Sequence, residues 1–96
     1  MQQDLIIKIS SKFNPKLIGV FGSYARNENS ISSDLDLLID FEEDINLLDI
    51  IGLEQDLSEA LEIKVDLVTV NSLNPQLKIY IEPDLILLPL PVNILK

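Results

Sequence analysis

The segment DLDLLIDF, residues 34–41, constrains the fold most, because it places two aspartates in an otherwise apolar strand pattern. Side chains alternate across a strand, so Asp34 and Asp36 share one face while Leu35 and Leu37 share the other. Ionised carboxylates in apolar surroundings are costly unless their charge is offset. The pattern therefore predicts a strand that needs either a protonated aspartate or a bound cation.

Helical and strand periodicities alternate along the rest of the chain. Apolar residues at helical spacing predict a first helix over residues 3–13, which ends before Asn14-Pro15. Further runs predict strands over 17–21, 34–41 and 63–70, helices over 22–28, 47–62 and 75–82, and either a fourth strand or an apolar tail over 85–88. The order indicates an α/β (α+β) domain in which helices flank a short mixed sheet.

A chain of 96 residues is expected to form a single domain, residues 1–96. Because 47% of the residues are hydrophobic, we expect a partner or a second copy to cover part of the apolar surface. The longest apolar stretch, residues 85–92, is too short to span a bilayer, and the N-terminus lacks the features of a secretory signal. We therefore expect a cytoplasmic protein that binds no membrane.

The charge and residue types exclude several kinds of chemistry. A net charge of −9, with seven scattered basic residues, argues against direct nucleic-acid binding, which needs clustered lysine and arginine. The chain has no histidine and no cysteine, so Ser-His-Asp and Cys-His catalysis, disulfides and thiolate zinc sites are excluded. An enzyme of this composition must use carboxylates and metal ions.

A third carboxylate, Asp66, lies between Val65 and Leu67 in the predicted strand over residues 63–70. If this strand neighbours the one that carries Asp34 and Asp36, all three carboxylates converge. Three unpaired carboxylates a few ångströms apart repel by several kcal/mol at an effective dielectric constant of about 20. Oxygen ligands without histidine or cysteine suit Mg²⁺ or Mn²⁺. The three aspartates are therefore candidate metal ligands.

Gly22-Ser23 supplies a complementary feature directly after the strand over residues 17–21. Glycine allows a tight turn and a close approach to a ligand, and the start of the following helix favours a phosphate group. Ser23 adds a hydroxyl, and Arg26 follows one turn later. Arg26 either contacts a phosphate or pairs with Glu28 or Asp34 on the surface. Phosphate donors beside metal-binding carboxylates predict a nucleoside triphosphate site.

Gly22-Ser23, ten intervening residues, Asp34 and Asp36, with a later strand Asp66, resemble the nucleotidyltransferase superfamily that includes DNA polymerase beta. The segment FGSYARNENSISSDLDLLI, in a chain of this length, is most similar to the minimal nucleotidyltransferase (MNT) antitoxins. The resemblance covers essentially the whole chain, although its specific motifs lie within residues 17–41 and 63–70. Asn27 departs from the motif, which usually has glycine there.

The resemblance implies a minimal nucleotidyltransferase fold and an activity. MNT antitoxins transfer AMP from ATP to a tyrosine hydroxyl of a HEPN-domain RNase toxin, which neutralises the toxin. By position, Asp34 and Asp36 would bind two Mg²⁺ ions (or Mn²⁺) and the triphosphate, and Asp66 would complete the metal site and help activate the hydroxyl. Gly22 and Ser23 would hold the phosphates, with Arg26 as a further nucleotide-binding residue. A hetero-oligomer of antitoxin and toxin is expected.

Two other functions remain open at this stage. The chain could be a non-catalytic antitoxin that neutralises its toxin by binding, since it is acidic and has surplus apolar surface. It could also be a small-molecule nucleotidyltransferase, although that activity normally needs an additional substrate-binding domain. The Gly-Ser turn could be an ordinary strand-to-helix turn, and the aspartates could lie on a solvated strand face.

Overall fold

The computed structural model describes residues 2–90. The helices are α1 (Gln3–Ser10), α2 (Gly22–Ala25), α3 (Leu47–Leu61) and α4 (Pro75–Ile81), with short 3₁₀ turns at Ser11–Phe13, Val70–Ser72 and Glu82–Asp84. The strands are β1 (Pro15–Phe21), β2 (Leu35–Phe41), β3 (Val65–Thr69) and β4 (Ile86–Leu87). Among these helices, none is long and apolar enough to cross a membrane.

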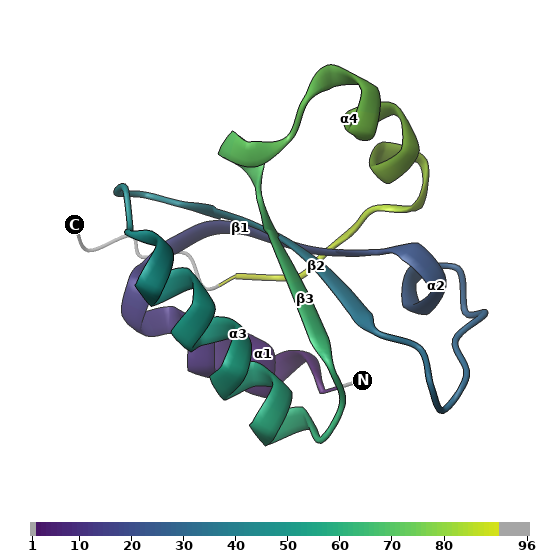
Figure 1. The fold of residues 1–96 in the computed structure, drawn as a ribbon, viewed down its shortest axis with the longest axis horizontal. Helices are drawn as coiled ribbons and strands as arrows, with labels where there is room; N and C mark the ends of the chain where they lie inside the picture. Colours follow the sequence, from purple (N-terminus) through teal and green to yellow (C-terminus); the bar gives the residue numbers. More distant parts are fainter. Residues whose placement is uncertain (1, 91–96) are drawn as a thin grey trace.

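The four strands form one mixed sheet in the order β3-β2-β1-β4 (Figure 1). β1 pairs antiparallel with both β2 and β4, whereas β2 and β3 run parallel. A parallel pair needs a crossover, which α3 provides. Because of these directions, the last residues of β1 lie beside the first residues of β2, at the same end of the sheet where β3 begins. The helix α2 lies at this end of the sheet.

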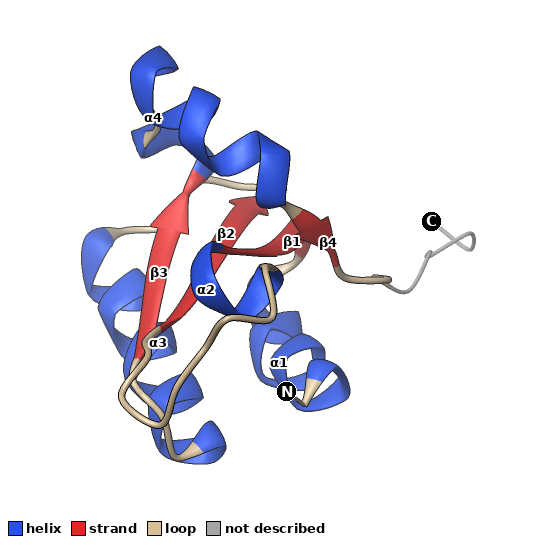
Figure 2. Ribbon diagram, turned by 90° about the vertical axis from the view of Figure 1, so that its right-hand side faces the viewer, coloured by secondary structure: helices blue, strands red, loops and turns tan. Residues whose placement is uncertain are grey.

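The core lies between one face of the sheet and the helices α1 and α3 (Figures 1 and 2). Alternation along β2 sends Leu35, Leu37 and Ile39 into this core, where each is fully buried. Leu53 and Leu57 of α3 meet them there. The aspartates of β2 and β3 therefore project from the opposite face, which α1 and α3 leave open.

The observed elements confirm the predicted mixed sheet and its flanking helices. Asn46 caps α3, because its side chain accepts a hydrogen bond of 2.8 Å from the Asp49 amide. The helix predicted over 22–28 is shorter than expected, since only Gly22–Ala25 are helical and Asn27 is left-handed with a φ of 59°. The apolar segment over 85–88 contains the short edge strand β4, and the last two residues of the longer apolar stretch over 85–92 lie outside the described residues.

Candidate active site

Gly22 brings the turn after β1 against the carboxylate of Asp36. Gly22 has a φ of 73°, a left-handed conformation that glycine adopts without strain. A Cβ at this position would overlap Oδ2 of Asp36 and lie 3.3 Å from its Cγ. The absence of a side chain at Gly22 therefore leaves the Asp36 carboxylate and the backbone of the turn in direct contact.

Asp36 and Asp66 occupy opposite positions in the parallel pairing of β2 and β3. This register confirms that the two strands are neighbours and that both carboxylates project from the same face of the sheet. Burial raises the pKa of Asp36, and the negative charges of Asp66 and Asp34 raise it further, whereas the positive charge of Arg26 lowers it. The site therefore carries electrostatic repulsion that its single nearby arginine only partly relieves.

Asp34 lies immediately before β2, and its carboxylate is 3.7 Å from Nζ of Lys64. Both side chains are partly exposed, so this contact is a weak one. Lys64 precedes β3 just as Asp34 precedes β2, and the Lys64 carbonyl accepts a hydrogen bond of 2.9 Å from the amide of Leu35. The sequence did not single out this lysine, whose position depends on the strand register.

The carboxylate oxygens of the three aspartates suit a hard divalent cation, although their side chains do not form a preformed metal site. Within residues 2–90, no group of three or more acidic side chains is arranged as a preformed metal centre. Asp34, Asp36 and Asp66 nevertheless offer only carboxylate oxygens, and their mutual repulsion is what a cation relieves. Their chemistry therefore fits the predicted metal ligands for Mg²⁺ or Mn²⁺.

Arg26 forms two ion pairs beside the site. Its Nε donates to Oε1 of Glu28 at 2.8 Å, and its Nη1 donates to Oδ2 of Asp84 at 3.0 Å. The predicted pairing with Glu28 is confirmed, whereas the alternative pairing with Asp34 is wrong because Asp34 faces Lys64. Asp84 was not predicted from the sequence, since it lies 58 positions away from Arg26.

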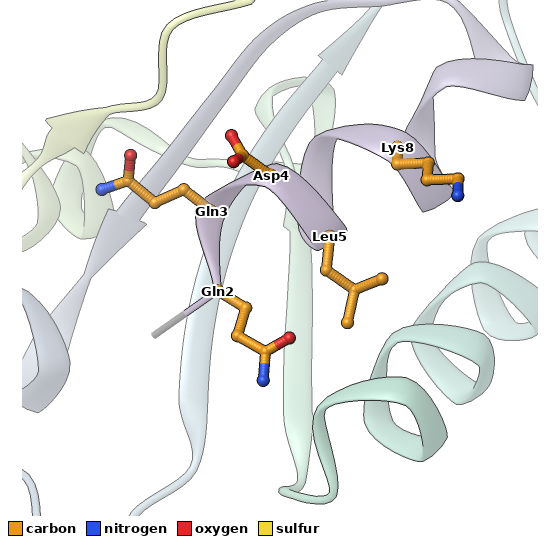
Figure 3. Close-up of a pocket in the computed structure, with 5 residues that line it drawn as sticks. All are labelled: Gln2, Gln3, Asp4, Leu5 and Lys8. Carbon is orange, nitrogen blue, oxygen red and sulfur yellow. The ribbon is translucent and has the colours of Figure 1, made fainter.

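The hollow in Figure 3 is separate from these residues. It is lined by residues of the first turns of α1 and the residue before them: Gln2, Gln3, Asp4, Leu5 and Lys8. None of the predicted site residues contributes to it. The carboxylates instead lie at the sheet face that α1 and α3 leave uncovered, where Asp66 is exposed and Asp34 and Asp36 are half-buried.

The fold and the site together define a class of protein. A mixed sheet carries paired carboxylates on adjacent parallel strands, and a glycine-serine turn leads into a short helix beside them. This arrangement is that of a nucleotidyl-transferring domain. The chain belongs to the nucleotidyltransferase domain family, whose model matches residues 4–88.

Two archaeal relatives lie close to the chain in sequence. A candidate protein adenylyltransferase of Methanocaldococcus jannaschii is 55% identical over 80 residues, which cover 82% of this chain and 82% of the relative. The protein adenylyltransferase MntA of Thermococcus cleftensis is 47% identical over 66 residues, 69% of this chain and 67% of the relative. The similarity therefore covers about two thirds or more of both relatives.

Solved structures share the same fold. A toxin–antitoxin structure with AMP-PNP superimposes with a TM-score of 0.85 at 26% identity, over 95% of this chain and 75% of that one. The MNT antitoxin of Shewanella oneidensis, in complex with a tri-AMPylated HEPN toxin, superimposes with a TM-score of 0.67 at 24% identity, over 94% of this chain and 74% of that one. These matches confirm the predicted minimal nucleotidyltransferase fold.

Proposed function

We propose that this chain is an antitoxin that transfers AMP from ATP to a tyrosine hydroxyl of a cognate HEPN-domain RNase toxin and thereby neutralises it. The observation that carries the proposal is the contact of Gly22 with the carboxylate of Asp36, which itself lies opposite Asp66. A relative named as a protein adenylyltransferase and a toxin–antitoxin neighbour with the ATP analogue AMP-PNP support it.

The turn after β1 is the proposed triphosphate site. The first amides of α2 have no acceptor within the helix, so Gly22 and Ser23 present backbone donors to phosphate oxygens. Arg26 adds a guanidinium whose 45% exposed side chain is held near the turn by two carboxylates. The triphosphate would then bind beside this turn, within reach of the aspartates of β2 and β3 through the metal ions that they hold.

The proposed reaction is an in-line displacement at the α-phosphorus of ATP. The tyrosine oxygen attacks this phosphorus and forms a new P–O bond, while the bond to the bridging oxygen breaks and pyrophosphate leaves with that electron pair. Asp66 accepts the hydroxyl proton, which then passes to solvent. Asp66 suits this role because its side chain is exposed at the face where the toxin tyrosine would arrive.

Asp34, Asp36 and Asp66 would also hold Mg²⁺ or Mn²⁺, two ions by resemblance to the family. A divalent ion at such a site supplies charge neutralisation between carboxylates and phosphates. The chain's own contribution is to fix the backbones of Asp36 and Asp66 opposite each other on two paired strands.

The direct test is the intact mass of the protein encoded beside this gene, the proposed HEPN-domain toxin, after incubation with the chain, ATP and Mg²⁺. We expect the mass to increase by whole AMP units, with the label on a tyrosine. The double variant Asp34→Asn/Asp36→Asn runs in parallel and should abolish the increase. Transfer that survives in the double variant would refute the proposal. Transfer to a small molecule in place of the toxin would favour the alternative of a small-molecule nucleotidyltransferase.

A second function, neutralisation by binding alone, is favoured by one observation. Apolar side chains are exposed on α4 and β4, where Ile79 is 70%, Tyr80 78% and Leu87 57% exposed. Such a surface is typical of a protein interaction site. Under this alternative, the Asp34/Asp36 double variant still protects cells from the toxin, and no covalent AMP forms on the toxin.

A further inference from the structure

Two polar side chains of α3 hold the strand that carries Asp66. Oε2 of Glu54 accepts a hydrogen bond of 2.8 Å from the backbone amide of Leu67. Oγ of Ser58 accepts one of 3.0 Å from the amide of Val65 and donates one of 2.8 Å to the Glu54 carbonyl. The two anchored amides belong to the residues on either side of Asp66.

These contacts close the open edge of the sheet at β3. β3 is an edge strand, and the Lys64 carbonyl faces β2, where it accepts from the Leu35 amide. Backbone groups alternate in direction along a strand, so Asp66 faces β2 while the amides of Val65 and Leu67 face outward. Without α3, those two amides would lack a partner in the sheet.

The spacing of the two acceptors matches the spacing of the two donors. Glu54 and Ser58 are four residues apart on a helix, a rise of about 6 Å. Val65 and Leu67 are two residues apart on a strand, a rise of about 6.6 Å. Because α3 and β3 run in opposite directions, Glu54 meets Leu67 and Ser58 meets Val65 at the same time.

We propose that Glu54 and Ser58 are positioning residues that fix Asp66 opposite Asp36 on the metal-binding face. This inference rests on the proposed function, in which Asp66 is a metal ligand and accepts the proton. Asp66 is held on one side by pairing with β2, and an edge strand can twist or slip unless its other side is also held. Neither α3 side chain points to the substrate face, so they act through Asp66.

The test compares four variants of the full chain. Glu54→Leu removes the acceptor for the Leu67 amide, whereas Glu54→Gln keeps a side-chain oxygen in its place. Ser58→Ala removes the second acceptor and serves if Glu54→Leu does not fold. Glu59→Leu makes the same chemical change at an exposed position of α3 and is the matched control. Each variant is measured for amide hydrogen exchange at Leu67, for Mn²⁺ affinity by calorimetry, and for kcat and KM of AMP transfer.

We expect Glu54→Leu to speed exchange at Leu67 and to weaken Mn²⁺ binding and kcat by about tenfold or more, since supporting residues of metal sites have effects of this size. Glu54→Gln and Glu59→Leu should stay close to the unmodified chain, and KM for ATP should change less than kcat. Unchanged Mn²⁺ affinity in Glu54→Leu and Ser58→Ala would overturn the inference, as would an unmodified chain that binds no Mn²⁺. An unmodified chain that binds Mn²⁺ but transfers no AMP would instead overturn the proposed function and leave the positioning role standing.

Discussion

The backbone of Gly22 packs directly against the carboxylate of Asp36, so a side chain at position 22 must displace one of the two. The contact joins the turn after β1 to Asp36, which lies opposite Asp66 in the pairing of β2 with β3. It explains why glycine is needed there for two separate reasons, the left-handed backbone and the space that Asp36 occupies.

Gly22→Ala is therefore expected to lower both stability and activity. The left-handed backbone costs alanine about 1–2 kcal/mol, and displacement of Asp36 should reduce AMP transfer by about 100-fold. Gly52→Ala is the control, because nothing lies within 4 Å of a Cβ at this position on α3. Gly52→Ala should instead stabilise the chain by about 0.5–1 kcal/mol, with activity unchanged. Urea unfolding and transfer kinetics of both variants measure the contrast, and equal behaviour would refute the role of the Gly22 contact.

The stability of the fold should depend on pH through the carboxyl group of Asp36. The raised pKa of Asp36, compared with an ordinary value of 3.8, means that the folded chain binds a proton there more readily than the unfolded chain does. The contribution of Asp36 to the free energy of unfolding therefore falls as the pH rises from 3.8 through the raised pKa. Asp36→Asn should be more stable than the unmodified chain at pH 7, and this advantage should shrink as the pH falls toward 4. Thermal unfolding without divalent ions, at steps between these pH values, measures the difference; a constant difference would contradict the assignment.

Arg26 and Asp84 form an ion pair that links α2 to the turn before β4. We expect Arg26→Ala and Asp84→Ala to be weakly but measurably coupled in a double-mutant cycle of unfolding, because both side chains are partly exposed to solvent. Arg26 with Glu28 is the comparison, and that pair should be coupled less because the Glu28 side chain is 64% exposed. The Arg26–Asp84 coupling should decrease in high salt. Strict additivity at low salt would show that the pair contributes nothing to the fold.

Several features of this site could be predicted from residue pattern alone. Asp36 and Asp66 each follow the alternation of a strand, so the face to which each projects follows from local rules. A helix of sufficient length separates β2 from β3 and allows the parallel pairing that is observed. The Gly22-Ser23 turn and the Asn46 cap have equally local signatures. These features can be predicted because the interactions that cause them involve residues only a few positions apart in the sequence.

Contacts between distant elements could not be predicted in this way. Asp84 lies in the turn before β4, which pairs with β1 far away in the sequence, and a two-residue strand leaves almost no periodic signal. In the sequence, Glu54 and Ser58 are ordinary polar residues of an amphipathic helix. Their role depends on the position of β3 beside α3, which the sequence alone does not specify. At Asn27, by contrast, the structure explains the departure from the family motif, because asparagine tolerates the left-handed backbone that glycine usually provides there.

The final prediction is that divalent ions stabilise the chain through the aspartates. Asp36 is repelled by Asp66 and Asp34, so a bound cation should relieve this repulsion and favour the folded state. At ten times its dissociation constant, Mg²⁺ or Mn²⁺ should add about 1.4 kcal/mol to the free energy of unfolding. Chelation with EDTA should remove this gain and stop AMP transfer, and Asp36→Asn/Asp66→Asn should show neither response. Asp56→Asn, which changes an exposed aspartate of α3 paired with Lys12, is the control and should respond like the unmodified chain. An equal rise in stability for the double variant would place the metal effect elsewhere on this acidic surface.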